Sequence, residues 1–291
     1  MDSCYKELKS FSEIIPLYDS YIIEVEGTIW SGNNKLEEAF KTLDYLKKNG
    51  KQIYFLSNQT NTTREDIHEK LKNFGFEASI DNIYNCALLS SKYIKKHHPQ
   101  VKRLYVIGEK GIIEEVRNEG FIVVSSQDQN NLKVSTEEEF QNMPTEEVDA
   151  VLSSFDMTYN YYKLAYASIC LDKGALFFAA NDESYVKVGS RNLPGTGAVT
   201  SSLEKVTNKE ATVIGPPNGY GIKLITSSHA IDEKKCLLIT DDIKAGVLFG
   251  KNSGLDTCLV MTGRTNQEVF AKEANKPDSI LPQYLCKDLS I

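Results

Sequence analysis

The stretch that decides the fold is IIEVEGTIWSG, residues 22–32, near the start of a chain of 291 residues. Its apolar residues predict a strand, and in a strand every second side chain lies on the same side. Glu24 and Glu26 are therefore expected on one side, with Val25 on the other. Gly27 permits a sharp turn directly after them. The pattern predicts an apolar strand that ends in two carboxylates beside a tight loop, where an anionic ligand could bind.

The residues that follow alternate between helical and strand patterns. Residues 35–48 carry apolar or small side chains at helical spacing and predict an amphipathic helix. Residues 52–56 predict a short buried strand that ends at Ser57, and residues 63–74 predict the next helix. Strand, helix and strand in this order form a βαβ unit, which implies a parallel sheet covered by helices. Ligands bind at the carboxyl ends of such strands, where the two glutamates and Ser57 lie.

A second α/β stretch occupies the middle of the chain. Residues 102–124 have the pattern of strand, helix and strand, and a further strand pattern lies at residues 150–152 after a polar segment. Strand patterns that fit the first sheet return at residues 212–215, 236–240 and 257–261. This order predicts a core domain, residues 1–99 and 209–291, that is split by an inserted α/β domain, residues 100–208.

Composition indicates an ordinary globular protein, with 41% apolar and 25% charged residues. The net charge of −7 and the pI near 5.3 argue against nucleic-acid binding, which favours a basic face. Six cysteines lie far apart without metal-ligand spacing, so we expect buried, reduced thiols. No apolar run approaches the roughly 20 residues of a transmembrane helix, and we recognise no signal peptide. The cytoplasm is the default compartment, and mitochondrial import without a cleaved presequence is the alternative.

The chain resembles the haloacid dehalogenase (HAD) superfamily, in particular the branch of 4-nitrophenylphosphatases, phosphoglycolate phosphatases and pyridoxal phosphate phosphatases. The order of segments carries this resemblance from about Leu17 to Leu281. It implies a Rossmann-like α/β core with a parallel sheet and an inserted α/β cap of the C2 type. In that superfamily the first acid of Asp-x-Asp-Gly attacks phosphorus, the second handles the proton of the leaving group, and Mg²⁺ bridges the first acid and the phosphate. Here Glu24 and Glu26 occupy these positions. Their extra methylene displaces both carboxylates, and a displacement of about 1 Å can cost roughly 10²-fold in rate.

The resemblance also assigns phosphate-binding and cationic positions. Ser57-Asn58 matches the Ser/Thr-Asn pair that holds phosphate oxygens, although such a pair also commonly caps a helix. The family segment Ile-Gly-Lys-Pro corresponds here to Ile-Gly-Pro-Pro, residues 214–217, so Pro216 stands where the lysine is lost. Loss of one preorganised electrostatic partner typically costs about 10²- to 10³-fold.

The last part of the site is an acid-rich turn, Gly-Asp-x-x-x-Thr-Asp in the family, that completes a Mg²⁺ site. Its counterpart starts at Thr240. Asp241 is retained and Asp242 imitates the adjacent aspartates of other branches, whereas Lys244 and Gly246 stand where the family has aspartates. An ammonium group among the ligands opposes cation binding. The resemblance thus implies a weak or lost metal site, with Asp241 and Asp242 as its remaining ligands. We expect no bound cofactor, or Mg²⁺ if the protein is active.

Residues 153–164 resemble a segment of the family's cap and contain Asp156, Tyr161 and Lys163. Proteins of this branch commonly pair through their caps. The resemblance therefore implies a homodimer, or a heterodimer with an active paralogue. A scaffold of this kind also suits a partner protein or a larger complex.

Our leading interpretation is a pseudophosphatase that is retained as a structural, scaffolding or regulatory protein. In this interpretation Lys244 lies near Glu24, Glu26 and Asp241 as an internal cation in place of Mg²⁺. The alternative for this lysine is a surface position. Two other functions stay open. One is a slow Mg²⁺-dependent phosphomonoesterase with Glu24 as nucleophile, and the other is a non-catalytic module that binds a phosphorylated ligand through the Ser-Asn pair.

Overall fold

The computed structural model describes residues 5–188 and 191–291 and divides them into two compact units. The first unit holds the described residues up to Ser57, together with Arg64–Tyr84 and Pro216–Ile291. The second unit holds Asn58–Thr63 and Asn85–Gly215. Each unit contains its own parallel sheet with helices, so the predicted α/β class is confirmed.

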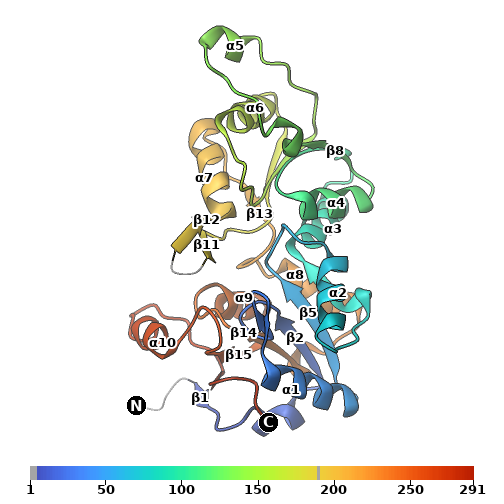
Figure 1. Ribbon diagram of the computed structural model, residues 1–291, viewed down its shortest axis with the longest axis vertical. Coiled ribbons are helices and arrows are strands. Elements are labelled where there is room, and N and C mark those ends of the chain that lie inside the picture. Colours follow the sequence, from blue (N-terminus) through green and yellow to red (C-terminus); the bar gives the residue numbers. More distant parts are fainter. Residues whose placement is uncertain (1–4, 189–190) are drawn as a thin grey trace. The chain divides into compact units, whose positions relative to one another are not determined.

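The first unit is built, in its described part, on a seven-stranded sheet with the order β1-β16-β15-β14-β2-β5-β6 (Figure 1). The pairings from β1 through to β5 are all parallel. The strands are β1 (Lys6–Glu7), β2 (Ser20–Glu24), β5 (Gln52–Ser57), β6 (Ile83–Asn85), β14 (Cys236–Thr240), β15 (Asp256–Val260) and β16 (Tyr284–Cys286). A small antiparallel hairpin, β3 (Trp30–Ser31) and β4 (Asn34–Lys35), follows the loop after β2.

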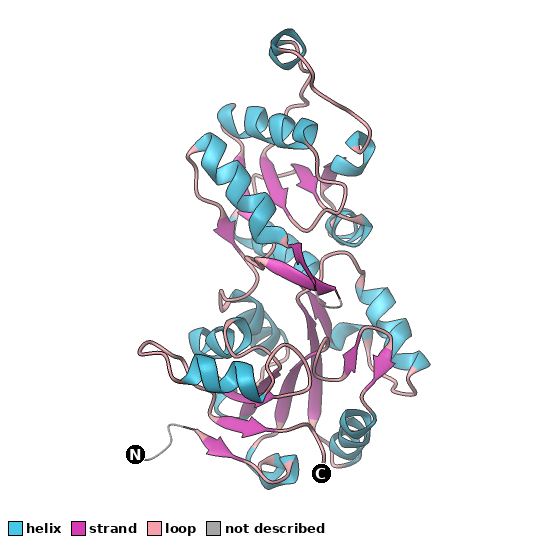
Figure 2. Ribbon diagram, turned by 60° about the vertical axis from the view of Figure 1, so that its left-hand side comes forward, coloured by secondary structure: helices cyan, strands magenta, loops and turns pink. Residues whose placement is uncertain are grey.

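Helices surround this sheet, and Figure 2 shows its strands side by side among them. The helices are α1 (Glu37–Lys48), α2 (Arg64–Asn73), α8 (Tyr220–Ser228), α9 (Ala245–Ser253) and α10 (Gln267–Ala274). Short 3₁₀ helices lie at Phe11–Glu13, Ile15–Leu17, Ile80–Asn82 and Glu233–Lys235. Tyr21, Ile22 and Ile23 of β2 are fully buried, as expected of a central strand whose two faces are both covered. The predicted βαβ unit of β2, α1 and β5 is confirmed.

The second unit contains a five-stranded parallel sheet with the order β13-β10-β9-β7-β8. Its strands are β7 (Arg103–Ile107), β8 (Ile122–Ser125), β9 (Ala150–Ser153), β10 (Leu176–Ala179) and β13 (Thr212–Val213), and a separate hairpin is formed by β11 (Tyr185–Val188) and β12 (Arg191–Pro194). Its helices are α3 (Cys86–His97), α4 (Lys110–Asn118), α5 (Glu137–Gln141), α6 (Tyr161–Asp172) and α7 (Thr196–Thr207), with a 3₁₀ helix at Ser126–Gln129.

Two elements that the sequence patterns assigned to the core domain belong to the second unit. Helix α3 belongs to the second unit, where it packs against α4. Strand β13 pairs with β10 through Phe178 and Thr212, so it completes the second sheet instead of returning to the first. A strand of two residues carries too little pattern to reveal its partner, because tertiary pairing decides it.

Two expectations from composition concern thiols and membrane spans. The cysteines of the described residues are free and buried, as predicted, and they are Cys86, Cys170, Cys236, Cys258 and Cys286. Cys4 lies outside the described residues. Within the part of the chain that the structure describes, no helix has the length and apolar character needed to cross a membrane.

Candidate active site

Three neighbouring strands of the first unit end at, or directly before, residues that the sequence singled out. Glu24 closes β2, Ser57 closes β5 and Thr240 closes β14, and the sheet order places β2 between the other two strands. The register pairs Glu24 with Leu56, so Ser57 lies one residue beyond it on the adjacent strand. Because all three strands are parallel, their carboxyl ends meet at one edge of the sheet.

The carboxylate of Glu24 is held by the end of β14. Thr240 Oγ1 donates a hydrogen bond of 2.6 Å to Glu24 Oε2, and the same hydroxyl accepts the backbone N–H of Asp242 at 3.1 Å. Glu24 is only 4% exposed and Thr240 is fully buried. A hydrogen bond to a carboxylate is stronger than one between neutral groups. The acid at the nucleophile position is therefore anchored to a neighbouring side chain.

The carboxylate of Glu26 has a different partner. Strand β2 ends at Glu24, so the alternation that predicted both acids on one side does not extend to Glu26. Glu26 Oε1 accepts the backbone N–H of Gly32 at 2.7 Å, in the turn of the β3–β4 hairpin. Lys70 donates to the carbonyl of Gly32 at 2.7 Å, and its Nζ lies 4.3 Å from the ring centroid of Trp30. Burial lowers the pKa of Lys70, and the charge of Glu26 opposes this shift.

Asp241 lies in a closed space between two glycine backbones. Its Oδ2 accepts the backbone N–H of Arg264 at 2.7 Å. A Cβ added to Gly27 would lie 2.5 Å from Asp241 Cγ, and one added to Gly263 would lie 2.8 Å from the same atom. Burial raises the pKa of Asp241 to about 6, the charge of Asp242 adds to the increase, and the N–H of Arg264 opposes it. The carboxylate is thus packed tightly and poorly hydrated.

Asp242 and Lys244 serve the start of α9 and the surface. Asp242 Oδ1 accepts the backbone N–H groups of Lys244 at 2.8 Å and Ala245 at 3.1 Å, as a capping side chain does. Lys244 Nζ lies 3.3 Å from Glu273 Oε1, and the lysine side chain is 64% exposed. The prediction that Lys244 is an internal cation beside the core acids is therefore wrong. The physical reason is that the ammonium group stays hydrated at the surface and pairs there with an acid of α10.

The resemblance implies Mg²⁺, and the residues present do not fit this ion. Across residues 5–188 and 191–291, no group of three His, Cys, Asp or Glu side chains is arranged to hold a metal. Gly246 offers no ligand, and a Cβ at this position would lie 2.7 Å from Thr240 Cβ. Mg²⁺ requires near-octahedral oxygen ligands, whereas Asp241 and Asp242 accept backbone N–H groups. The role of these two aspartates as residual ligands stays a prediction.

The phosphate-binding pair and the lost lysine position lie at the ends of unit segments. Ser57 is 2% exposed and ends a segment of the first unit. Asn58 begins a segment of the second unit, where its carbonyl accepts Asn181 Nδ2 at 2.9 Å. Pro216 begins the last segment of the first unit, and no cation stands at that position. The phosphate-binding role of the pair stays a prediction.

The acid and the lysine predicted in the cap form a buried ion pair. Lys163 Nζ lies 2.7 Å from Asp156 Oδ2, and both side chains are fully buried. The ammonium group also donates to Asn130 Oδ1 at 2.6 Å and to Thr158 Oγ1 at 3.0 Å. Tyr161 is 69% exposed. Asp156, Asn130 and Thr158 all belong to the second unit, so these contacts fix the start of α6 within that unit.

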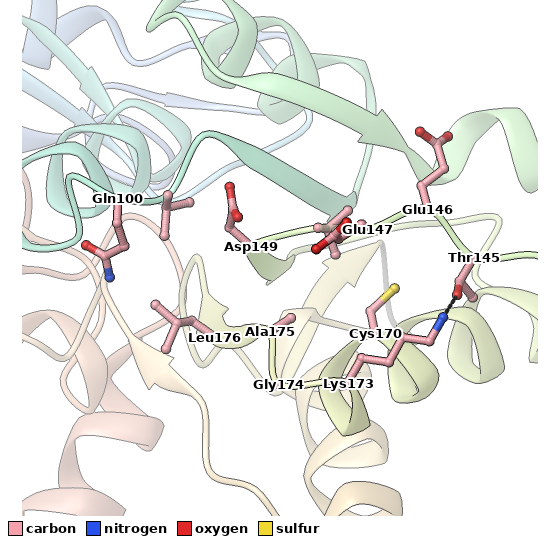
Figure 3. Close-up of a pocket in the computed structure, with 12 residues that line it drawn as sticks. Gln100, Thr145, Glu146, Glu147, Asp149, Cys170, Lys173, Gly174, Ala175 and Leu176 are labelled. Carbon is pink, nitrogen blue, oxygen red and sulfur yellow. Dashed lines mark hydrogen bonds between the residues drawn. The ribbon is translucent and has the colours of Figure 1, made fainter.

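A cavity of about 550 Å³ in the second unit contains none of the predicted site residues (Figure 3). It is lined by Gln100, Val101 and residues from 145–149 and 170–176, at the amino ends of β9 and β10. Lys173 in its wall donates to Thr145 at 2.6 Å. Asp149 accepts the backbone N–H groups of residues 102 and 103. Lys173, Thr145 and Asp149 of the lining thus make hydrogen bonds within the second unit.

Sequence reasoning missed the residues that close the site. They are Thr240 on Glu24, Gly32 on Glu26, and Gly263 with Arg264 around Asp241. One signal was present. In the acid-rich turn the family has a glycine where this chain has Thr240, and an aspartate where it has Gly246.

The sequence of the chain is similar to that of known proteins over nearly its whole length. A haloacid dehalogenase-like hydrolase model matches residues 21–122, and a HAD-hydrolase-like model matches residues 213–287. The 4-nitrophenylphosphatase of Schizosaccharomyces pombe is 29% identical over 288 residues, which cover 97% of this chain and 95% of that protein. The chloroplastic phosphoglycolate phosphatase 1A of Arabidopsis thaliana is 26% identical over 289 residues, which cover 98% of this chain and 79% of that protein.

A solved structure shows the same fold. The 4-nitrophenylphosphatase of Thermotoga maritima superposes with a TM-score of 0.81 at 20% identity, over 95% of this chain and 96% of that one. The two family models together span more than half of the chain, and the fold agrees with them. The chain belongs to the haloacid dehalogenase-like hydrolase superfamily, and its relatives include 4-nitrophenylphosphatases and phosphoglycolate phosphatases.

Proposed function

We propose that this protein is a pseudophosphatase, a HAD-superfamily core with little or no Mg²⁺-dependent hydrolysis that acts by binding another protein. One observation carries the proposal. The acid at the nucleophile position, Glu24, is buried and accepts the Thr240 hydroxyl at 2.6 Å. A carboxylate that must attack phosphorus needs an oxygen free to approach the substrate in line. The hydrogen bond directs Oε2 toward Thr240 and lowers the nucleophilicity of the carboxylate.

The surroundings of Glu24 support the same conclusion. Pro216 supplies no cation for the transferred phosphoryl group, and Lys244 is directed to Glu273 instead. Asp241 is enclosed between glycine backbones, where a hydrated Mg²⁺ has little space. Each loss alone costs about 10²-fold or more, and losses within one catalytic unit combine without simple addition.

A second candidate is a slow Mg²⁺-dependent phosphomonoesterase with Glu24 as nucleophile and Glu26 as acid/base. The comparisons favour this candidate, because the full-length relatives reported above are phosphatases. Phosphate-ester hydrolysis leaves room for it, since enzymes accelerate such reactions by up to about 10²¹-fold. A third candidate, binding of a phosphorylated ligand through Ser57 and Asn58, predicts thermal stabilisation by the ligand without product.

Hydrolysis of 4-nitrophenyl phosphate by the purified protein, in 5 mM EDTA and in ~10 mM MgCl₂, tests the first two candidates. The matched variants are Glu24→Ala, which removes the acid at the nucleophile position, and Glu273→Ala, which removes an acid of α10 that pairs with Lys244 and Lys276. The S. pombe relative serves as the active control. We expect no Mg²⁺-dependent release of 4-nitrophenol above that of Glu24→Ala. Turnover that requires Mg²⁺, is lost in Glu24→Ala and is retained in Glu273→Ala would establish the phosphomonoesterase instead.

The binding function needs a partner, and the second unit offers exposed apolar side chains. Met157 and Tyr161, four residues apart before and at the start of α6, are 70% and 69% exposed. The proposal therefore includes a homodimer, or a heterodimer with a paralogue, through the second unit. Light scattering of the purified chain distinguishes monomer from dimer. Met157→Ser with Tyr161→Ser should shift a dimer to monomer without lowering the unfolding temperature, and an unshifted dimer would place the contact elsewhere.

A further inference from the structure

We infer that the Thr240 side chain excludes any side chain from position 246, and that Thr240 together with Gly246 takes the place of a metal ligand in the first unit. The Thr240 side chain fills the volume that any side chain at position 246 would need. The core of this protein is therefore closed without a divalent cation, and one substitution cannot reopen it.

The geometry at position 246 leaves no room for a side chain. Gly246 is the second residue of α9 and is buried. A Cβ built on it would lie 2.7 Å from Thr240 Cβ and 3.1 Å from Thr240 Cγ2, and closer still to Oγ1. Contacts under 3.0 Å are essentially absent between real Cβ atoms and their neighbours. The helix backbone approaches the end of β14 this closely only because residue 246 is glycine.

The Thr240 hydroxyl also supplies hydrogen bonds that replace ligand contacts. It donates to Glu24 Oε2 at 2.6 Å and accepts the backbone N–H of Asp242 at 3.1 Å. A buried carboxylate requires a donor or a cation, because an uncompensated charge in the interior is costly. Thr240 meets this requirement for Glu24 with a neutral group. In this inference the Thr240 hydroxyl compensates Glu24 in place of a metal ion, and glycine at position 246 leaves room for it.

The inference does not depend on whether the protein turns over a phosphate ester. Metal-free hydrolysis would overturn the proposed function and leave the closed pair intact. Stabilisation of the unaltered protein by Mg²⁺ without turnover would overturn the closed pair and leave the proposed function intact.

The test combines steric and metal measurements on the full chain. Gly246→Ala adds one methyl group against Thr240, and we expect it to lower the unfolding temperature by about 5 to 10 °C. In the double variant Thr240→Gly/Gly246→Ala the clash is gone. Its unfolding temperature should therefore lie above the value expected if the two single shifts added. Ala245→Ser, one position away on α9, is the control for a small added group and should shift the temperature by less than about 2 °C. A Gly246→Ala variant as stable as the unaltered protein, or strict additivity of the pair, would overturn the inference.

The metal arm uses Mg²⁺ itself as the probe. For the unaltered protein, the unfolding temperature should be the same in EDTA and in MgCl₂. The same should hold for Thr240→Gly. Thr240→Gly/Gly246→Asp should gain a rise of several degrees in MgCl₂, since it restores an acid beside Asp241 and Glu24. A rise in the unaltered protein would show that a cation site is present, and no rise in the double variant would show that position 246 is not the missing ligand. Either result overturns the inference.

Discussion

Replacing Thr240 by valine tests how strongly the Thr240 hydroxyl holds the core together. Valine keeps the shape of threonine and removes the donor to Glu24 Oε2 and the acceptor for the N–H of Asp242. A hydrogen bond to a charged group contributes about 1.5–3 kcal/mol, and one between neutral groups about 0.5–1.5 kcal/mol. Because Glu24 is 4% exposed, water cannot easily replace the lost donor. We expect Thr240→Val to lower the free energy of unfolding by about 2–4 kcal/mol at neutral pH.

The chain offers a matched control and an internal probe. Thr226 is 4% exposed and donates to Glu233 Oε1 at 2.9 Å, but the Glu233 side chain is 35% exposed and also pairs with Lys223. Thr226→Val should therefore cost less than about 1 kcal/mol. The single tryptophan, Trp30, is buried in the first unit, so its fluorescence in urea follows the unfolding of that unit.

The comparison of the two variants decides the matter. If Thr240→Val costs no more than Thr226→Val, the hydroxyl does not compensate a buried charge and the reasoning is wrong. Repeating Thr240→Val in a Glu24→Gln background gives a second check. With the charge removed, the cost should fall by about 1–1.5 kcal/mol, since the bond to position 24 becomes one between neutral groups while the bond from the Asp242 N–H is lost in both backgrounds.

Three further predictions concern buried and exposed charges. Burial raises the pKa of Asp241 to about 6 from 3.8, so the folded state binds the proton more tightly and stability should fall as pH rises from about 4 to 6, by roughly 3 kcal/mol. Asp241→Asn should remove this slope in urea titrations between pH 4 and 7.5, and an unchanged slope would contradict the assignment. Lys163→Met should lower the free energy of unfolding by about 3–5 kcal/mol, because Asp156 stays buried without its cation. The double variant Lys163→Met/Asp156→Leu should lose less stability, and equal losses of the two variants in thermal unfolding would refute this. Lys244→Ala should change the free energy of unfolding by less than about 1 kcal/mol, since the Lys244 side chain is 64% exposed and hydrated, and a larger loss would speak for a buried role.

The central strands of the first unit could be predicted from the sequence because their signals are local. Ile22 and Ile23 form an apolar run, which the two glutamates and Gly27 follow. Gly27 has a φ of +77°, in the left-handed region that glycine favours. The helix and strand that follow carry complete patterns of their own. Parallel pairing then places their carboxyl ends together whatever the loops do.

The closure of the site could not be predicted in the same way, because it depends on contacts between distant residues. Thr240 and Glu24 are 216 positions apart, and the contact between Thr240 and Gly246 depends on how α9 leaves β14. The direction of Lys244 likewise depends on Glu273, which belongs to another helix. A motif aligned position by position shows which residue types changed, but it does not show which changed residues touch.

The two glutamates acquire a physical role once these contacts are known. Glu24 reaches the hydroxyl of Thr240 on the next strand, and Glu26 reaches the backbone N–H of Gly32 in the hairpin. An aspartate at either position would end about one C–C bond short, roughly 1.5 Å, and would lose the hydrogen bond unless the backbone moved. The longer side chains, Thr240 and Gly246 therefore depend on one another. Restoring the family residue at Glu24, Glu26 or Thr240 removes a hydrogen bond, and restoring an aspartate at Gly246 places its side chain against Thr240. Such interdependence is what the proposed pseudophosphatase requires of its core.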